Sequence, residues 1–238
     1  MRWKDGLSVS AELERDGAQD VKAVLFDWDG TLIDSGAILI TCWHRMSEQV
    51  LGYRFPVEEA DRRKFLAMRG ADSFPLLSDD PSVLAAMDQS FTDAYLELAA
   101  VHVRAFDHAT ELLEALRARG IRTGVVTSKT QLRFNRDAEI TGLDDLLDVV
   151  VTGDDVTQAK PHPEGVLAAL ATLGVEPEHA WFVGDGPVDV RAGLAAGVTA
   201  VAITHGLHSA DELHPASPLH MVASLEELAA LVAAQTSD

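Results

Sequence analysis

The chain has 238 residues, 47% of them hydrophobic and 24% charged, a composition typical of a globular protein of one or two domains. Its formal net charge of −19 leaves no large basic surface, which excludes nucleic acid as an expected partner. An acidic protein attracts divalent cations, and it needs local positive charge or a metal to hold an anionic substrate.

No apolar segment has the length of a signal peptide or of a membrane span. The single cysteine, Cys42, excludes an intrachain disulfide and fits a reducing compartment, and we expect it to pack inside a helix. We therefore expect a cytoplasmic protein without a membrane partner. Residues 1–20 alternate polar and apolar side chains and are expected to form a loose N-terminal extension.

Short apolar runs predict the strands of a sheet. They cover residues 21–26, 121–127, 149–152, 180–183 and 198–203, with a shorter candidate at 221–223. Asp107 is placed to cap a helix that ends at Gly120, and Pro163 to lie in the first turn of a helix that ends at Gly174. Strands that alternate with helices predict an α/β fold whose parallel sheet is covered on both faces.

Residues 36–103 break this alternation, because they show only helical periodicity. The helical segments are 38–50, 58–68 and 81–100. We expect a second, all-helical domain here, with residues 21–35 and 104–238 as the core. In an open α/β sheet the carboxyl ends of the strands hold the site, so an insertion directly after the first strand is expected to lie over that site as a lid.

Asp27 and Asp29 follow the first expected strand, in a turn shaped by Gly30. Residues two apart in extended backbone point the same way, so both carboxylates are able to address one reacting centre. One is then a candidate nucleophile and metal ligand, and the other a candidate general acid and base. An ordinary turn is the alternative, because Asp and Gly are common turn residues.

The ends of three further strands carry groups that suit phosphate and a hard cation. The Thr127 hydroxyl, followed by Ser128 and a helix start, is placed to bind a phosphate oxygen, although such residues also cap many helices. Lys160 is a candidate to neutralise phosphate, with an ordinary surface lysine as the alternative. Asp185 and Asp189 supply carboxylate oxygens four residues apart, which suits Mg²⁺.

In this order the motifs resemble those of the haloacid dehalogenase (HAD) superfamily, over about residues 22–206. The matching segments are 27–34 for the first motif, Thr127 for the second, Lys160 for the third, and Gly184 and Asp185 with Asp189 for the fourth. The helical insertion resembles the C1 cap of the phosphoglycolate-phosphatase and β-phosphoglucomutase subgroups. The resemblance implies a Rossmann-like sheet in which the strands that precede Asp27 and Asp185 lie side by side.

The resemblance also implies a role for each residue. Asp27 attacks phosphorus and forms an aspartyl-phosphate, and Asp29 protonates the leaving oxygen and then activates water. Thr127 and Lys160 hold the phosphoryl group, helped by Ser128, which stands where relatives often have Asn. These roles agree with the positioning and charge neutralisation that phosphoryl transfer requires.

Mg²⁺ is the implied cofactor. The resemblance assigns it to the carboxylates of Asp27 and Asp185 and the backbone carbonyl of Asp29, with Asp189 close by. Dehalogenases of the superfamily lack an acid at the position of Asp29, so its presence favours a phosphoester over a haloacid.

Two features near the motifs are expected to be structural. Trp28, between the two aspartates, is expected to pack away from the site. His205 and His208 are expected to be a solvent-facing pair, since the other predicted ligands are carboxylates and favour Mg²⁺ over zinc.

Specificity is expected to come from the insertion. Arg69 and Gly70 follow an expected helix where related caps place a substrate loop. Arg69 is a candidate for binding an anionic group on the leaving alcohol, or else an ordinary surface arginine. His44 and Arg45 are weaker candidates.

Hydrolysis of a small phosphorylated metabolite by a Mg²⁺-dependent phosphatase is the leading hypothesis. A sugar-phosphate mutase is the first alternative, because it uses the same four motifs and returns the phosphoryl group to its product. A non-catalytic phospho-acceptor is the second. The motifs predict neither the particular phosphomonoester nor the oligomeric state.

Overall fold

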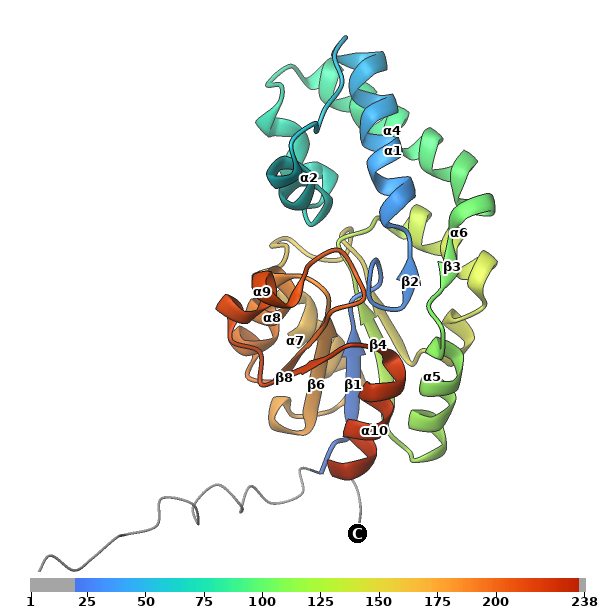
Figure 1. Ribbon diagram of the computed structural model, residues 1–238, viewed down its shortest axis with the longest axis vertical. Helices are drawn as coiled ribbons and strands as arrows, with labels where there is room; N and C mark the ends of the chain where they lie inside the picture. The colour runs from blue at the N-terminus through green and yellow to red at the C-terminus, as the bar shows by residue number, and fades with distance from the viewer. Residues whose placement is uncertain (1–19, 236–238) are drawn as a thin grey trace, which may run out of the picture.

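The computed structural model describes residues 20–235 as a sheet flanked by helices, with a further group of helices above it (Figure 1). The expected N-terminal extension, residues 1–20, lies outside the described residues apart from Asp20. The main sheet has six parallel strands: β1 (Ala23–Phe26), β4 (Arg122–Val126), β5 (Val149–Val151), β6 (Ala180–Gly184), β7 (Thr199–Ile203) and β8 (His220–Val222). Their order in space is β5-β4-β1-β6-β7-β8. The six expected strands and the Rossmann-like α/β fold are confirmed, including the pairing of β1 with β6.

Five helices pack on the sheet: α5 (Ala109–Ala118), α6 (Gln131–Thr141), α7 (Glu164–Leu173), α8 (Pro187–Ala196) and α10 (Leu225–Gln235). Val24 and Phe26 of β1 share one buried cluster with α5, α6 and α10. Ala23 and Leu25 share another with α7 and α8. Because both faces of the strand are buried, its sequence is a continuous apolar run. The sheet is therefore covered on both faces, as expected.

Two expected helix starts differ from the structure by a residue. The residue before α5 is His108, with a left-handed backbone (φ 66), so the turn places one more residue between Asp107 and the helix than expected. Asp107 therefore does not cap α5. Pro163 precedes α7 directly instead of lying in its first turn. Gly120 and Gly174 follow the helix ends with φ of +74 and +67, as expected for glycine at such positions.

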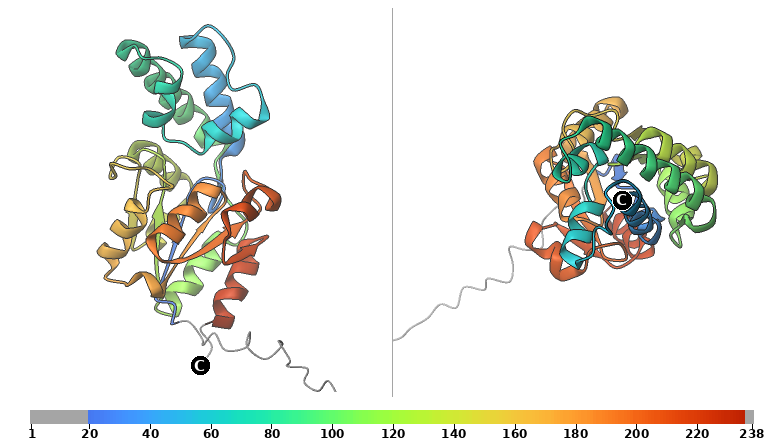
Figure 2. Two further views of the ribbon diagram at one scale, coloured as in Figure 1. Left: turned by 90° about the vertical axis from the view of Figure 1, so that its left-hand side faces the viewer. Right: turned by 90° about the horizontal axis from the view of Figure 1, so that it is seen from above.

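Four helices lie between the short strands β2 (Ile33–Asp34) and β3 (Arg104–Ala105): α1 (Gly36–Val50), α2 (Glu59–Leu66), α3 (Gly70–Ser73) and α4 (Pro81–His102). These helices and their loops are called the cap below, and the rest of the described chain the core. The cap stands beyond the carboxyl ends of the strands (Figures 1 and 2). Trp43 of α1 lies at its centre, 5.4 Å from the ring centroids of Phe65 and Phe74. That the cap is a separate domain stays a prediction.

The antiparallel pair of β2 and β3 was not predicted. Ile33 pairs with Ala105 and Asp34 with Arg104. A strand of two residues is too short to produce a detectable alternation of apolar and polar side chains. The two connections between core and cap therefore run side by side. The remaining elements are α9 (Ala210–Leu213) and the 3₁₀ helices Phe74–Leu76, Asp144–Leu146, Pro177–His179 and His214–Ala216.

Cys42 and Trp28 pack as expected. Cys42 is fully buried in α1, and burial raises the pKa of its thiol to about 12. Trp28 is also fully buried, with its ring centroid 4.8 Å from that of Phe134. Within residues 20–235, no helix combines the length and the apolar character needed to cross a membrane.

Candidate active site

The carboxyl ends of β1, β4 and β6 meet at one edge of the sheet, beneath the cap. The chain runs from β1 towards β4 and β5 on one side and returns to β6, β7 and β8 on the other, so this edge is the switch point of the fold. A cavity of about 40 Å³ there is lined by Asp27, Asp29, Thr127, Ser128, Lys160, Asp185 and Asp189. The structure thus brings together all the core residues that the motifs singled out.

Lys160 is the positive centre of this edge. Its ammonium group donates to Asp27 Oδ1 at 2.5 Å, to Asp189 Oδ1 at 2.6 Å and to the carbonyl of Val126 at 3.2 Å. Burial lowers the pKa of Lys160, but the carboxylates of Asp189 and Asp27 outweigh that effect and hold it above its ordinary value. The lysine therefore stays charged although it is buried.

Asp27, Asp185 and Asp189 are buried, and one carboxylate oxygen of each lies within 4.8 Å of the others. Burial raises the pKa of Asp27 to about 7, against the lowering effect of Lys160. Burial also holds the pKa of Asp185 well above its ordinary value, and the Asp27 carboxylate adds to the rise. Three carboxylates thus face one ammonium group, and their oxygens and excess negative charge fit Mg²⁺.

The backbone closes tightly around the Asp185 carboxylate. Gly30 has a φ of +80, and a Cβ atom there would lie 2.3 Å from Asp185 Oδ2. A Cβ at Gly206 would meet the same oxygen at 2.3 Å. The N–H of Leu207 donates to this oxygen at 2.6 Å. Asp185 is thereby fixed in one orientation toward the cluster.

The expectation that His205 and His208 face solvent is wrong for His208, whereas His205 is half-buried. His208 is buried, and its Nδ1 lies 3.1 Å from the carbonyl oxygen of Asp185. His205 stacks on Phe106, with 4.0 Å between the ring centroids. The hydrogen bond from the N–H of Leu207 to Asp185 holds the loop after β7 against the aspartate cluster. Both imidazoles belong to this loop and therefore lie against the core. Burial lowers the pKa of both histidines.

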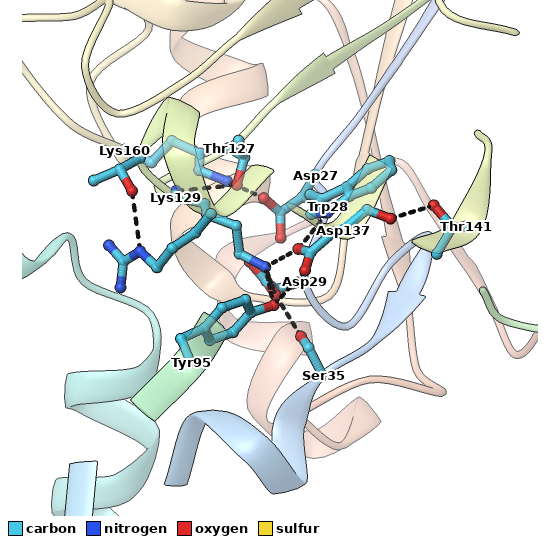
Figure 3. A network of polar contacts seen from close by, with 12 residues as sticks. Asp27, Trp28, Asp29, Ser35, Tyr95, Thr127, Lys129, Asp137, Thr141 and Lys160 are labelled. Atoms are coloured by element: carbon cyan, nitrogen blue, oxygen red, sulfur yellow. Dashed lines mark hydrogen bonds and ion pairs between the residues drawn. The ribbon is translucent and has the colours of Figure 1, made fainter. Parts of the chain in front are cut away.

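Thr127 and Ser128 lie where β4 ends. Thr127 is buried, and its hydroxyl accepts the N–H of Lys129 at 3.1 Å. Figure 3 shows Thr127 close to Asp27 and Lys160. Ser128 lines the small cavity beside Asp27 and also two cavities beneath the cap. Ser128 therefore stands between the reactive cluster and the space under the cap.

Asp29 is held by a second buried lysine, Lys129, which lies outside the four sequence motifs. Lys129 Nζ lies 2.8 Å from Asp29 Oδ1, and the Lys129 side chain is 2% exposed. The Ser35 hydroxyl donates to the same carboxylate oxygen. Figure 3 shows Asp29 between these two groups. An ion pair and a hydrogen bond therefore fix the orientation of the Asp29 carboxylate.

Lys129 also joins the core to the cap. Its ammonium contacts the carboxylate of Asp137 on α6, and it donates to the hydroxyl of Tyr95 on α4 at 2.6 Å. The Tyr95 hydroxyl donates to Asp137 Oδ1 at 2.8 Å, and Trp28 Nε1 donates to Asp137 Oδ2 at 3.0 Å. Burial raises the pKa of Asp137 against the lowering effect of Lys129. Tyr95, a residue of the cap, thus contacts both the lysine that holds Asp29 and the Asp137 carboxylate that pairs with this lysine.

The sequence contained one usable signal for this network. Lys129 follows Thr127 and Ser128 as an ordinary polar residue of a loop, and Tyr95 lies 34 residues away on a cap helix. Asp137, however, stands three residues after Phe134 and directly before Ala138, on the face of the helix that these apolar residues predict to be buried. An acid on the buried face of a helix requires a partner, and that requirement pointed to a nearby cation.

Arg69 and Gly70 lie on the side of the cap that faces the core. All three guanidinium nitrogens of Arg69 donate to protein oxygens. The acceptors are Asp72 and the backbone carbonyls of Gly153, Val156 and Thr157, at 2.7 to 3.3 Å. Arg69 thus fastens the cap to the core. A substrate role for Arg69 and Gly70 stays a prediction, and Gly70 lines both cavities beneath the cap.

His44 and Arg45 make contacts within the cap. His44 Nε2 lies 2.9 Å from the carbonyl oxygen of Pro56, and Arg45 donates to Glu97 at 3.1 Å. Neither residue lines the cavities beside Asp27 or Asp29. The structure therefore does not bring these two candidates to the site.

The chain is similar to enzymes that act on phosphate. Its residues 24–203 match the family model for haloacid dehalogenase-like hydrolases. A pyrophosphatase PpaX from Bacillus pumilus is 31% identical over 215 residues, covering 90% of this chain and 97% of the relative. An N-acetylmuramic acid 6-phosphate phosphatase from Pseudomonas aeruginosa is 34% identical over 197 residues, covering 80% and 85%.

The fold has equally clear counterparts. A haloacid dehalogenase-like hydrolase from Bacteroides fragilis superposes with a TM-score of 0.79 at 28% identity, covering 87% of this chain and 99% of that one. Because the match covers so much of both chains, it includes the cap as well as the sheet.

Proposed function

The chain belongs to the haloacid dehalogenase-like hydrolase family, and we propose that it is a Mg²⁺-dependent phosphatase that forms an aspartyl-phosphate on Asp27. The relatives named above, a pyrophosphatase and an N-acetylmuramic acid 6-phosphate phosphatase, support hydrolysis of phosphate compounds as its activity. The observation that carries the proposal is the contact of Lys160 with both Asp27 and Asp189 inside the buried cluster. The substrate is a small phosphorylated metabolite. A cytoplasmic location stays a prediction.

Asp27 is the nucleophile in this proposal. Lys160 holds its Oδ1, so Oδ2 is the oxygen that attacks phosphorus. As the bond from Oδ2 to phosphorus forms, the bond from phosphorus to the leaving oxygen breaks. Water later attacks phosphorus, the bond from phosphorus to Oδ2 breaks, and orthophosphate leaves while the Asp27 carboxylate is regenerated. Thr127 and Ser128 orient the phosphoryl oxygens, and the Lys160 ammonium neutralises their charge.

Asp29 is the general acid and base. It lines both the cavity beside Asp27 and the adjoining cavity beneath the cap, so it lies between the phosphoryl group and the leaving group. Its carboxyl group gives a proton to the leaving oxygen and then takes one from the attacking water. The ion pair with Lys129 and the hydrogen bond from Ser35 both engage Asp29 Oδ1. Oδ2 is therefore the oxygen that gives and takes the proton.

The residues that would hold Mg²⁺ are Asp27, Asp185 and the backbone carbonyl of Asp29. When bound, the ion supplies positive charge to the phosphoryl oxygens and the leaving oxygen. Asp189 contacts Lys160 at 2.6 Å and accepts the N–H of Gly186 at 2.9 Å, so it also orients the lysine. The chain thus places one cation of its own beside the position proposed for the metal.

Release of orthophosphate from a panel of phosphorylated metabolites, with and without Mg²⁺, tests the proposal. Asp27→Asn is expected to lower kcat by about 10⁴-fold or more, because an amide oxygen is a poor nucleophile. Asp20→Asn is the matched control, since the Asp20 side chain is 73% exposed. Mg²⁺-dependent turnover that survives in the Asp27 variant would contradict the nucleophile assignment.

The same assay separates the alternatives. A sugar-phosphate mutase would convert its substrate to an isomer with little release of orthophosphate. A phospho-acceptor would take up one equivalent of phosphate and then stop. Continuous release of orthophosphate excludes both.

A further inference from the structure

Arg133 of α6 is a buried cation without a carboxylate partner. It is 7% exposed, and among the described residues no carboxylate oxygen lies within 4.0 Å of its nitrogens. Its Nε donates to Thr130 Oγ1 at 3.0 Å, and the guanidinium carbon lies 4.9 Å from the ring centroid of Phe91. Within residues 20–235, the two terminal nitrogens donate to no protein acceptor.

The other buried cations around the site differ from Arg133 in this respect. Lys129 contacts Asp29 and Asp137, and Lys160 contacts Asp27 and Asp189. A buried charge is costly unless it is paired, and a stacked aromatic ring compensates only part of that cost. The unpaired guanidinium lines two cavities, and its terminal nitrogens are therefore free to bind an anion that the chain itself does not supply.

The position of Arg133 shows where such an anion would lie. Arg133 lines a cavity of about 50 Å³ that also contains Asp29 and Lys129. It lines a second cavity, of about 300 Å³, as well. The two cavities share Gly70, Phe74 and Ser128, so they adjoin. Arg133 thus stands at the far side of Asp29, where the leaving group of the substrate must lie.

The walls of these cavities favour a single anionic group on an otherwise uncharged body. Phe74 lines both cavities, and Leu84 lines the larger one. Two acids also line the larger cavity, Asp88 and Asp154, and the Asp154 carboxylate accepts the N–H of Gln131 at 2.8 Å. Arg69 lines the larger cavity too, but all its guanidinium nitrogens already donate to protein oxygens, so negative charge on the ligand is best placed at Arg133.

On the basis of the proposed phosphatase activity, we propose that the alcohol part of the substrate carries a second anionic group, a carboxylate or a phosphate, which binds the terminal nitrogens of Arg133. A guanidinium group suits both anions, because it donates two parallel hydrogen bonds to neighbouring oxygens. Arg133 is thus a specificity-determining residue on the core side of the cap.

Three esters with a similar six-carbon skeleton test this proposal and distinguish the two anions. They are glucose 6-phosphate, with a neutral leaving group, 6-phosphogluconate, with a carboxylate, and glucose 1,6-bisphosphate, with a second phosphate. The pair of 2-hydroxyethyl phosphate and 2-phosphoglycolate repeats the comparison at a shorter reach. The unsubstituted chain is expected to have the higher kcat/KM for the acidic member of at least one pair.

Arg133→Gln is expected to lower kcat/KM for that acidic ester by about 10- to 100-fold, the usual worth of charge-assisted hydrogen bonds, and to leave its neutral counterpart within about twofold. Arg133→Lys keeps the charge, and its kcat/KM for the acidic ester is expected to lie between those of the unsubstituted chain and Arg133→Gln. Arg136→Gln is the matched control, because Arg136 lies on the same helix but pairs with Glu139 at the surface. An equal loss on acidic and neutral esters would overturn the proposal, since a merely structural arginine predicts that result.

Binding separates this proposal from the proposed function. In the Asp27→Asn background, calorimetry with each ester reports affinity without turnover, and Arg133→Gln is expected to weaken only the acidic ester. If the unsubstituted chain hydrolyses none of the esters, the phosphatase proposal fails while this preference is still measurable. If the chain hydrolyses esters and no acidic ester is preferred in either assay, only the Arg133 proposal fails.

Discussion

Two buried lysines divide the site into regions that are built differently. Lys160 lies between Asp27 and Asp189, and its partners all belong to the core. Lys129 lies beside Asp29, and its partners include Tyr95 of the cap. Both side chains are less than one-tenth exposed, so the difference lies in where their partners come from.

This difference indicates how the two chemical tasks depend on the cap. The contacts among Lys160, Asp27 and Asp189, at the proposed phosphoryl position, come from the core alone. The groups around Asp29, the proposed acid/base, include Tyr95 of α4, and Arg69 fastens the cap above them to the core. Cap position is therefore expected to govern protonation and specificity more than the attack on phosphorus.

Of the two lysines, Lys160 is expected to give the larger effect. Lys160→Met removes the cation between Asp27 and Asp189, and we expect kcat/KM to fall by about 10³-fold, as for other lost electrostatic contacts to a transition state. Steady-state phosphate release measures this effect. Lys22→Met is the control, because the Lys22 side chain is 51% exposed and pairs with the exposed Asp20. A smaller loss of activity in Lys160→Met than in Lys129→Met would contradict the expected difference between the two lysines.

Lys129→Met is expected to lower kcat by about 10²-fold, because the Asp29 carboxylate loses the ion pair that orients it. It is also expected to cost about 3–5 kcal/mol of unfolding free energy, since Asp137 remains buried without a cation. Urea unfolding and single-turnover kinetics measure the two effects separately. Adding Asp137→Asn should restore part of the stability and none of the activity. Recovery of both would make Lys129 a purely structural residue.

Tyr95→Phe is a milder substitution in the same network, made from the cap, and its effects are compared with those of Lys129→Met. It removes only the hydroxyl that contacts Lys129 and Asp137, so the loss of stability should be about 1 kcal/mol and the loss of kcat less than that of Lys129→Met. Tyr53→Phe should change neither quantity, because Tyr53 is 51% exposed.

The smallest effect is expected on the stability of the core cluster. Burial raises the pKa of Asp27 from 3.8 to about 7, so proton uptake stabilises the metal-free fold at acid pH, and this contribution is lost as the pH rises through about 7. Mg²⁺ competes with those protons and should therefore raise the melting temperature by a few degrees more at pH 8 than at pH 5.5. Thermal unfolding with Mg²⁺ or a chelator measures this. Asp185→Asn should remove most of the shift, and an equal shift at both pH values would contradict the assignment.

The residues predicted from sequence are those whose position follows from the chain direction of a parallel sheet. Asp27, Thr127 and Asp185 directly follow β1, β4 and β6, and the side-by-side pairing of these strands places the residues together. Lys160 lies farther along a loop, and the family resemblance was needed to place it. Recognition of the three strands was therefore enough to predict that Asp27, Thr127 and Asp185 lie together.

The residues that were missed depend on contacts between distant segments. Lys129 and Arg133 are ordinary polar residues in the sequence, and their burial depends on Tyr95 and Phe91 of the cap. His208 was expected at the surface because the loop after β7 contains no strong apolar signal. No local pattern reports that a loop folds inward onto a carboxylate.

The pairing of β2 with β3 has a consequence for how this enzyme can change. Because Ile33 lies opposite Ala105, the insert leaves and re-enters the core at neighbouring points. An insert with adjacent ends adds little loop-closure entropy to the core, whatever its length. We therefore expect the cap to behave as an exchangeable module, so that a different helical segment grafted between these two residues meets the same sheet edge. Variation among such enzymes is expected to concentrate in that segment while the chemistry beneath it is inherited unchanged.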